Sequence, residues 1–343
     1  MDLEADVTAQ RSRANFQAIA RLAELGDFTT AFALRTVCKL RLADYLAEGP
    51  RSADELAEAT GTHAPSLLRA LRALVAKAIL AEPSPGRFEL TDMGDLLRSD
   101  HPLSMRQAFR LYPDVQALSE LGYTVRTGEA AFAHLFGEDY FTYLAARPEL
   151  LDDFRGSQAA LTRLELLAIG RVYDWSTVGT LVDLGGNDGA LMAALAARHP
   201  DLRGVLVDLP EAVAEAPKVF AEAGVAGRCE IVAGSFFEVP IPPGADVYVI
   251  KRVLVGFGDT EAEKLLAAVR SAMRPDSRLL VMEPMVTGDD FGTGTGLDVL
   301  MLVLNEGRVR TAEEFSRLLD VAGFTTSRVL EAALLRIVEA RRG

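Results

Sequence analysis

The spacing of apolar positions changes once along this chain. Up to about residue 170, apolar residues recur every three or four positions, which is typical of helices that bury one or more faces. After Trp175, short apolar runs are separated by helical stretches, and this alternation predicts a parallel sheet covered by helices on both faces. The predicted strands are 179–184, 203–208, 229–233, 245–251, 278–283, 324–330 and 333–339. Two of the helices among them are predicted to open with capping boxes, Thr260-Glu-Ala-Glu263 and Thr311-Ala-Glu-Glu314. The expected fold class is therefore α/β, with a doubly wound, mostly parallel seven-stranded sheet behind a helical N-terminal part.

The first hundred residues predict a winged helix. Between Phe16 and Leu46 the helices are so apolar that they need a partner surface, and a homodimer is one way to supply it. Ser52-Ala-Asp-Glu55 is a capping box that opens a short helix, and Pro65 lies near the start of the next one. A β-hairpin is predicted over residues 78–91, because two apolar runs flank a Pro/Gly turn there.

The charge of the chain argues against DNA binding by this element. Its second helix offers Arg69 and Arg72 as basic residues, within a chain of net charge −13. Binding of nucleic acid depends on Lys and Arg contacts to phosphate. We therefore expect a homodimer through the N-terminal domain and no nucleic-acid partner, and the alternative of a winged-helix regulator is disfavoured.

Length and composition set the domain organisation. A chain of 343 residues exceeds the usual size of one core. The expected domains are 1–100 (winged helix), 101–172 (helical, substrate pocket) and 173–343 (sheet). Both cysteines, Cys38 and Cys229, are expected to be free buried thiols.

Nothing in the sequence indicates a membrane or export signal. The first residues include Asp2, Glu4 and Asp6, unlike a signal or transit peptide, and no run of about 18 apolar residues is present. We expect a cytoplasmic protein without a membrane partner.

A glycine-rich turn after the first predicted strand is half of a nucleotide site. Gly185 and Gly186 remove Cβ atoms where backbone passes close to a ligand, and Gly189 lets helix and strand approach. Asp208 ends the next strand, where ribose hydroxyls are bound in such folds. The spacing is GGxxG rather than GxGxxG, and no P-loop lysine follows, so a nucleoside without a pyrophosphate fits better. The alternative is an ordinary glycine-rich turn.

Aromatic residues gather in the helical region before the sheet. Most such rings belong to a core, but some are expected to line a pocket for a flat aromatic substrate. The residues are Phe132, His134, Phe136, Tyr140, Phe141, Tyr143 and Phe154.

Seven segments, in order, resemble the motifs of one enzyme family. They are 182–189, 208–210, 234–240, 246–251, 278–283, 298–301 and 307–311. Together they resemble the small-molecule O-methyltransferases that use S-adenosylmethionine and carry an N-terminal winged-helix dimerisation domain, in particular the branch that tailors bacterial natural products. The resemblance covers nearly the whole chain and implies a Rossmann-like methyltransferase sheet.

The resemblance also implies a cofactor site. Its residues would be Asp183, Gly185, Gly186, Asp208, Leu209, Ser235, Phe236, Phe237 and Lys251. The two glycines would pass under the amino-acid tail, Asp208 would hold the ribose, and Leu209 and Phe236 would flank the adenine. Lys251 would lie near the polar groups of the cofactor. Asn187 and Ser235 depart from the family, which has glycine and aspartate at these positions.

The main departure concerns the catalytic base. The family has a Leu-His-Asp-Trp segment whose histidine takes the proton of the substrate hydroxyl, whereas this chain has Val255 at the histidine position and Gly256 at the aspartate position. Val309 replaces the glutamate that orients that histidine, and Leu254 and Asp259 keep the alignment in register. The proton acceptor and its orienting partner are therefore both absent.

Two reactions are compatible with this loss. Holding the nucleophile and methyl carbon in line lowers the activation barrier by roughly 7–11 kcal/mol. A general base raises the rate by about 10²–10⁴-fold, which is a smaller effect. Methyl transfer to an acidic phenol, an amine or a thiol can therefore survive without the histidine. His134 is a candidate substitute base. The alternative is a non-methylating enzyme, such as a hydroxylase, decarboxylase or cyclase, that holds S-adenosylmethionine as a bound charge.

No metal is expected, and the substrate is expected to be a bulky aromatic or polyketide-like secondary metabolite. Its predicted contacts are Phe154, Gln158, Val255, Phe257, Met301, Leu302 and Asn305.

Overall fold

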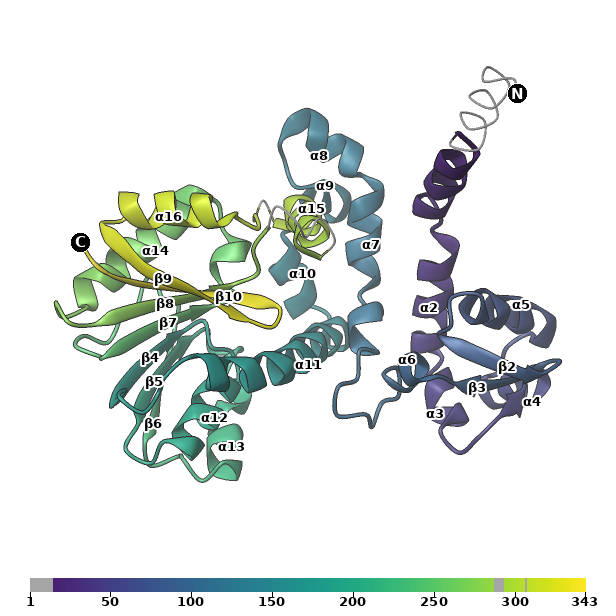
Figure 1. Cartoon of the computed structure of the whole chain (residues 1–343), viewed down its shortest axis with the longest axis horizontal. Coiled ribbons are helices and arrows are strands. Elements are labelled where there is room, and N and C mark those ends of the chain that lie inside the picture. The colour runs from purple at the N-terminus through teal and green to yellow at the C-terminus, as the bar shows by residue number, and fades with distance from the viewer. Residues whose placement is uncertain (1–14, 287–292, 306) are drawn as a thin grey trace, which may run out of the picture. The chain divides into compact units, whose positions relative to one another are not determined.

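The computed structural model describes residues 15–286, 293–305 and 307–343, so the acidic start of the chain lies outside the described residues. The chain divides into two compact units, one up to Arg110 and one from Leu111 onward (Figure 1). The helical region that follows residue 110 therefore belongs to the same unit as the sheet.

The first unit contains the predicted winged helix. Its elements are a helix over 15–25, α2 (Thr29–Lys39), α3 (Leu42–Leu46), β1 (Arg51–Ser52), α4 (Ala53–Thr60), α5 (Ala64–Val75), β2 (Leu80–Ser84), β3 (Arg87–Leu90), α6 (Asp92–Asp95) and η1 (Gln107–Phe109). The strands form an antiparallel sheet in the order β1-β3-β2. Ser52 caps α4 with the reciprocal bonds of a capping box, as predicted. Leu56, Leu71 and Phe88 are fully buried in the core of this unit.

A row of large apolar side chains near the start of the first unit is exposed. Phe16, Ile19, Leu22, Leu25 and Phe28 are each 64% to 72% exposed. They are spaced three residues apart; the first four lie in the helix over 15–25, and Phe28 precedes α2. An exposed apolar surface of this kind is typical of a protein interface.

The second unit is built on the predicted seven-stranded sheet. Its strands are β4 (Thr180–Leu184), β5 (Arg203–Asp208), β6 (Cys229–Ala233), β7 (Val247–Lys251), β8 (Arg278–Glu283), β9 (Phe324–Ala332) and β10 (Leu335–Arg342). They lie in the order β6-β5-β4-β7-β8-β10-β9. The first five are parallel, and β10 runs antiparallel to both of its neighbours. The doubly wound, mostly parallel sheet is confirmed.

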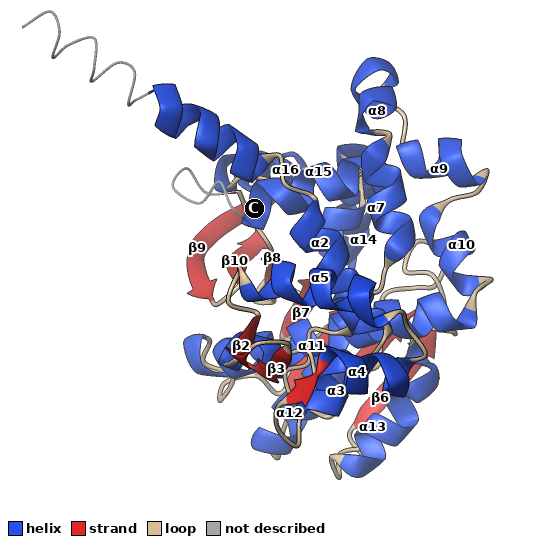
Figure 2. Ribbon diagram, turned by 90° about the vertical axis from the view of Figure 1, so that its right-hand side faces the viewer, coloured by secondary structure: helices blue, strands red, loops and turns tan. Residues whose placement is uncertain are grey.

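Helices cover both faces of this sheet (Figures 1 and 2). They are α12 (Ala190–Arg198), η2 (Val213–Glu215) and α13 (Ala216–Glu222) on one face, and α14 (Asp259–Ala272) and α16 (Ala312–Val321) on the other, with η3 (Leu254–Gly256) after β7. Side chains alternate along each strand, so Leu181 and Val249 pack under α12 whereas Val182 and Ile250 pack under α14. Two separate cores result.

A group of helices packs beside the sheet around an aromatic cluster. They are α7 (Tyr112–Ser119), α8 (Leu121–Thr127), α9 (Ala131–Phe136), α10 (Tyr140–Ala145), α11 (Pro148–Val172) and α15 (Thr293–Asn305). The ring of buried Phe132 lies 5.1 Å from that of Tyr140 and 5.3 Å from that of Tyr143, both edge-on. Val303 and Leu304 of α15 pack into the same cluster.

One predicted helix start was wrong. Thr260-Glu-Ala-Glu263 was expected to be a capping box, but α14 begins at Asp259 after Gly258 and has no side-chain cap. The Asp259 carboxylate lies in the first turn, where the helix dipole favours it, and is bound by Arg310. The box at Thr311-Ala-Glu-Glu314 is confirmed, and Cys38 and Cys229 are free and buried, as predicted. Across the described ranges, no helix has the length and hydropathy needed to cross a membrane.

Candidate active site

The glycine turn at the end of β4 leaves no room for side chains. Gly185 has a φ of +74°, and a Cβ there would collide with Val253. A Cβ on Gly186 would collide with the Asp183 carboxylate and with Leu206. The backbone of the turn is therefore drawn tightly over the ends of the strands, which is what close approach to a ligand requires.

Asp208 fixes this turn from the end of β5. Its Oδ2 accepts the Asn187 N–H at 2.8 Å, and its Oδ1 accepts the Leu209 N–H at 2.8 Å. Asn187 has a left-handed φ of +53°, and the bond to Asp208 secures that conformation. Burial raises the pKa of Asp208. Each carboxylate oxygen keeps acceptor capacity for a further hydroxyl donor.

Asp183 is a fully buried carboxylate with no hydrogen-bond partner for either oxygen among the described residues. Burial raises its pKa to about 7, although nearby Lys251 opposes the shift. A buried carboxylate without partners is costly, and a cationic ligand group would relieve the cost. The residues present therefore fit a ligand that carries positive charge.

A buried ion cluster lies beside Asp183. Glu165 of α11 is completely buried, and its Oε2 accepts from the Lys251 ammonium at 3.0 Å. Its Oε1 accepts from Arg252 Nε at 2.7 Å. Glu165 was not predicted as a site residue, and the only signal for it in the sequence is an acid inside the apolar stretch 164–169. Lys251 was expected near the cofactor, and the structure pairs it with Glu165.

Three phenylalanines, of which Phe237 is exposed and the other two are half-buried, lie together after β6 and β7. The ring centroids of Phe236 and Phe237 are 4.9 Å apart, and Phe257 lies 6.2 Å from Phe236 and 5.5 Å from Phe237. Phe237 is 44% exposed, and Leu209 is 43% exposed. The Ser235 hydroxyl accepts the Phe237 N–H at 3.3 Å. Apolar rings of this kind suit contact with a planar base.

Two buried charged residues, both missed by the sequence analysis, lock the turn that contains Val255. Glu283 Oε1 accepts the N–H groups of Val253 and Leu254 at 2.8 and 2.7 Å. Arg310, 1% exposed, donates to the Leu254 carbonyl at 2.8 Å and the Phe257 carbonyl at 3.0 Å. Burial raises the pKa of Glu283 to about 7. The turn from 253 to 257 is therefore held from both sides.

Several predicted substrate residues are brought together around this turn. A Cβ on Gly307 would collide with the Val255 carbonyl and would lie 2.9 Å from Asn305 Oδ1, so these two residues lie on either side of Gly307. Phe154 and Met301 both pack against the aromatic cluster. The remaining predicted contacts are half-buried Gln158 and Phe257 and exposed Leu302. Val309 is buried, and its N–H donates to Asp298 Oδ1 at 2.7 Å.

His134 lies apart from these groups in its described contacts. Its side chain is exposed on α9, and its ring stacks on Tyr123 with centroids 3.9 Å apart. Among the described residues its ring contact is with Tyr123, and the aromatic cluster that contains Phe154 does not include it. The structure therefore offers no support for His134 as a base.

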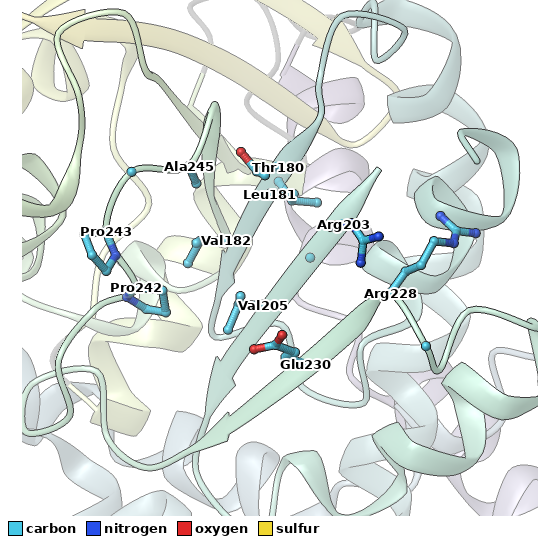
Figure 3. Close-up of a pocket in the computed structure, with 13 residues that line it drawn as sticks. Thr180, Leu181, Val182, Arg203, Val205, Arg228, Glu230, Pro242, Pro243 and Ala245 are labelled. Carbon is cyan, nitrogen blue, oxygen red and sulfur yellow. The ribbon is translucent and has the colours of Figure 1, made fainter. Parts of the chain in front are cut away.

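A hollow in the second unit lies away from these groups. It has a volume of about 170 Å³ and is lined by residues at the amino ends of β4, β5 and β6, among them Thr180, Arg203 and Glu230 (Figure 3). The glycine turn, Asp208 and Lys251 lie at the carboxyl ends of the strands, where ligands bind in open α/β sheets. We place the candidate active site at the carboxyl ends because the glycine turn and the charged residues lie there.

The fold and this site together define a Rossmann-like nucleoside-binding enzyme. Residues 118–325 match the O-methyltransferase domain, and residues 23–100 match the O-methyltransferase dimerisation domain. The chain therefore belongs to the O-methyltransferase family and is an S-adenosylmethionine-dependent methyltransferase.

Named relatives cover most of the chain. A phenazine O-methyltransferase from Lysobacter antibioticus is 39% identical over 312 residues, covering 90% of this chain and 91% of the relative. An aclacinomycin 10-hydroxylase from Streptomyces purpurascens is 36% identical, covering 88% of this chain and 82% of the relative. The solved structure of a mitomycin 7-O-methyltransferase superposes with a TM-score of 0.88 at 34% identity, covering 98% of this chain and all of that one.

Proposed function

We propose that this enzyme transfers the methyl group of S-adenosylmethionine to a bulky aromatic or polyketide-like secondary metabolite, without a protein base at the family's histidine position. The observation that carries the proposal is the locked turn around Val255. Because Glu283 and Arg310 hold both sides of the turn, Val255 occupies a defined place there, and an aliphatic side chain accepts no proton.

The cofactor would be held at the carboxyl ends of β4 and β5. Asp208 would bind the ribose hydroxyls, since its carboxylate is already oriented by two backbone N–H groups. Asp183 would bind a positively charged part of the cofactor, because both its oxygens lack partners in the described structure. Leu209, Phe236 and Phe237 would contact the adenine. When bound, the cofactor supplies an electrophilic methyl carbon on a positively charged sulfur.

The substrate would lie against the turn and the aromatic cluster. Phe154, Met301 and Phe257 offer apolar surface, while Gln158 and Asn305 offer amides that fix its orientation. Relatives are named for O-methylation of a phenazine and of mitomycin, which supports a bulky secondary metabolite as the substrate here. The exposed row of apolar side chains on the first unit and the match to the dimerisation domain support a homodimer.

The chain's residues would contribute position and exclusion of water. The bound cofactor would supply its methyl carbon to an acceptor oxygen that is ionised before reaction, and the electrons of the carbon–sulfur bond would stay on sulfur. Opposite charges are neutralised in this step, so an apolar surround such as Val255 and Phe257 favours it. The acceptor's proton leaves to solvent before attack rather than to a side chain.

The test is to incubate the enzyme with methyl-labelled S-adenosylmethionine and a panel of phenols, amines and polyketide acceptors. The proposal expects labelled product and one S-adenosylhomocysteine per product. Conversion of an acceptor with the cofactor left intact would contradict it and would indicate a reaction like the one named for the hydroxylase relative.

A further inference from the structure

Three charged side chains occupy one side of the sheet at the ends of β4 and β7. Asp183 is paired in register with Val249, so Lys251, two residues later, projects from the same face. Glu165 lies one helical turn before Ile169, which packs into the core on that face. Asp183, Lys251 and Glu165 therefore share one buried region.

Both basic side chains in this region, those of Lys251 and Arg252, pair with Glu165 rather than with Asp183. Lys251 donates to Glu165 Oε2 at 3.0 Å and to the Thr162 hydroxyl at 3.4 Å. Arg252 takes the other oxygen of Glu165, with its Nη2 at 2.6 Å from Oε1. Both oxygens of Glu165 are thus occupied, whereas both oxygens of Asp183 have no partner among the described residues.

Lys251 pairs with Glu165 although Asp183 also lies on a neighbouring strand. A lysine has a flexible four-carbon stem, and a carboxylate on the adjacent strand of the same face is within its reach. Attraction between buried charges is strong because the local dielectric constant is low. If Glu165 did not hold Lys251, the ammonium would turn to Asp183 and would compete with any positively charged ligand.

We propose that Glu165 is a positioning residue that holds Lys251 away from Asp183 and so keeps the Asp183 carboxylate open to the positive charge of the cofactor. The proposal rests on the proposed function, because it takes S-adenosylmethionine as the ligand of Asp183. It also gives Lys251 a role through Glu165 rather than through direct contact with the cofactor.

Calorimetric titration with S-adenosylhomocysteine tests this without catalysis. Glu165→Gln should weaken binding by about tenfold or more, since the ligand must then displace a charged hydrogen bond between Lys251 and Asp183. Lys251→Met alone should leave binding within about threefold of wild type, and Glu165→Gln/Lys251→Met should restore it to that range. A tenfold loss in Lys251→Met alone would overturn the proposal.

A second double variant separates positioning from support of the fold. Glu165→Gln also leaves Arg252 buried and unpaired, so loss of binding through loss of stability should be rescued by Glu165→Gln/Arg252→Met instead. The proposal expects no recovery of binding in that variant. The proposal would be overturned if Glu165→Gln/Arg252→Met recovered binding. It would also be overturned if Glu165→Gln/Lys251→Met did not recover binding, or if Glu165→Gln alone bound as tightly as wild type. Absence of binding by the wild-type enzyme would instead refute the proposed cofactor site.

Discussion

Cofactor binding should depend on pH through Asp183. Burial raises the pKa of this carboxyl to about 7, and neither oxygen has a partner among the described residues. The ammonium group of the ligand's amino-acid tail, which S-adenosylhomocysteine shares with S-adenosylmethionine, binds the ionised form, so binding lowers the pKa and releases a proton below pH 7. With a pKa near 7, about a tenth of the carboxyl is ionised at pH 6 and about nine tenths at pH 8, which makes the affinity about tenfold higher at pH 8.

The assay is calorimetric titration with S-adenosylhomocysteine from pH 6 to pH 8, in buffers of different ionisation enthalpy so that proton release is counted. Asp183→Asn is the matched control, because the amide has the same shape and does not titrate. It should bind about tenfold or more weakly at pH 8, from the loss of a charge-assisted hydrogen bond, and its affinity should not vary with pH. A wild-type affinity that is flat over this range, or a slope that persists in Asp183→Asn, would refute the reasoning.

The same carboxyl predicts a change in stability. Its folded pKa of about 7 lies above the ordinary 3.8 of an unfolded aspartate, so the folded state binds the proton more tightly. Stability from this group is fully present below about pH 4 and is lost as the pH rises to 7. Each pKa unit is worth about 1.4 kcal/mol, so the ionised form costs the ligand-free fold roughly 4 kcal/mol above pH 7. S-adenosylhomocysteine should therefore raise the melting temperature more at pH 8 than at pH 6, and Asp183→Asn should remove this difference.

Three further substitutions test the turn and the missing base. Val255→His should raise kcat/KM for a weakly acidic phenol by about tenfold, less than the full effect of a general base because no glutamate stands at Val309 to orient it; no gain in a steady-state assay would show that deprotonation is not needed at that place. Glu283→Ala should lower the free energy of unfolding in urea by about 2–6 kcal/mol, since two buried N–H groups lose their acceptor, whereas Glu283→Gln should lose less; equal losses would contradict this. His134→Ala should change kcat/KM by less than about threefold, because the side chain is exposed, and a loss of a hundredfold would make it a base after all.

The elements that could be predicted from the sequence are those determined by residues close together in the chain. All seven strands were found because each is a short apolar run, and the capping boxes at Ser52 and Thr311 were found because the partner lies three residues away. The box at Thr260 failed for the opposite reason. Asp259 is bound by Arg310, which lies 51 residues further along the chain, and the helix starts there.

The charged groups that shape the site could not be predicted in the same way. Glu165 is separated by 86 residues from Lys251, and Glu283 by 29 residues from Leu254. Periodicity shows which positions are buried, but it does not show which buried charges meet. The residues of the glycine turn were predictable because their constraint is the backbone conformation itself, as the left-handed φ of Gly185 shows.

The most direct test of transfer without a protein base is the pH dependence of kcat/KM for a series of phenols of differing acidity, followed by release of S-adenosylhomocysteine. Without a base at Val255, kcat/KM should rise with pH up to the ionisation of each phenol, so the midpoint should move with the acceptor. The cofactor is kept saturating at every pH, so that ionisation of Asp183 does not change the rate. A midpoint that stays at one pH for every phenol would then reveal a titrating group of the enzyme that takes the proton, and would contradict this account.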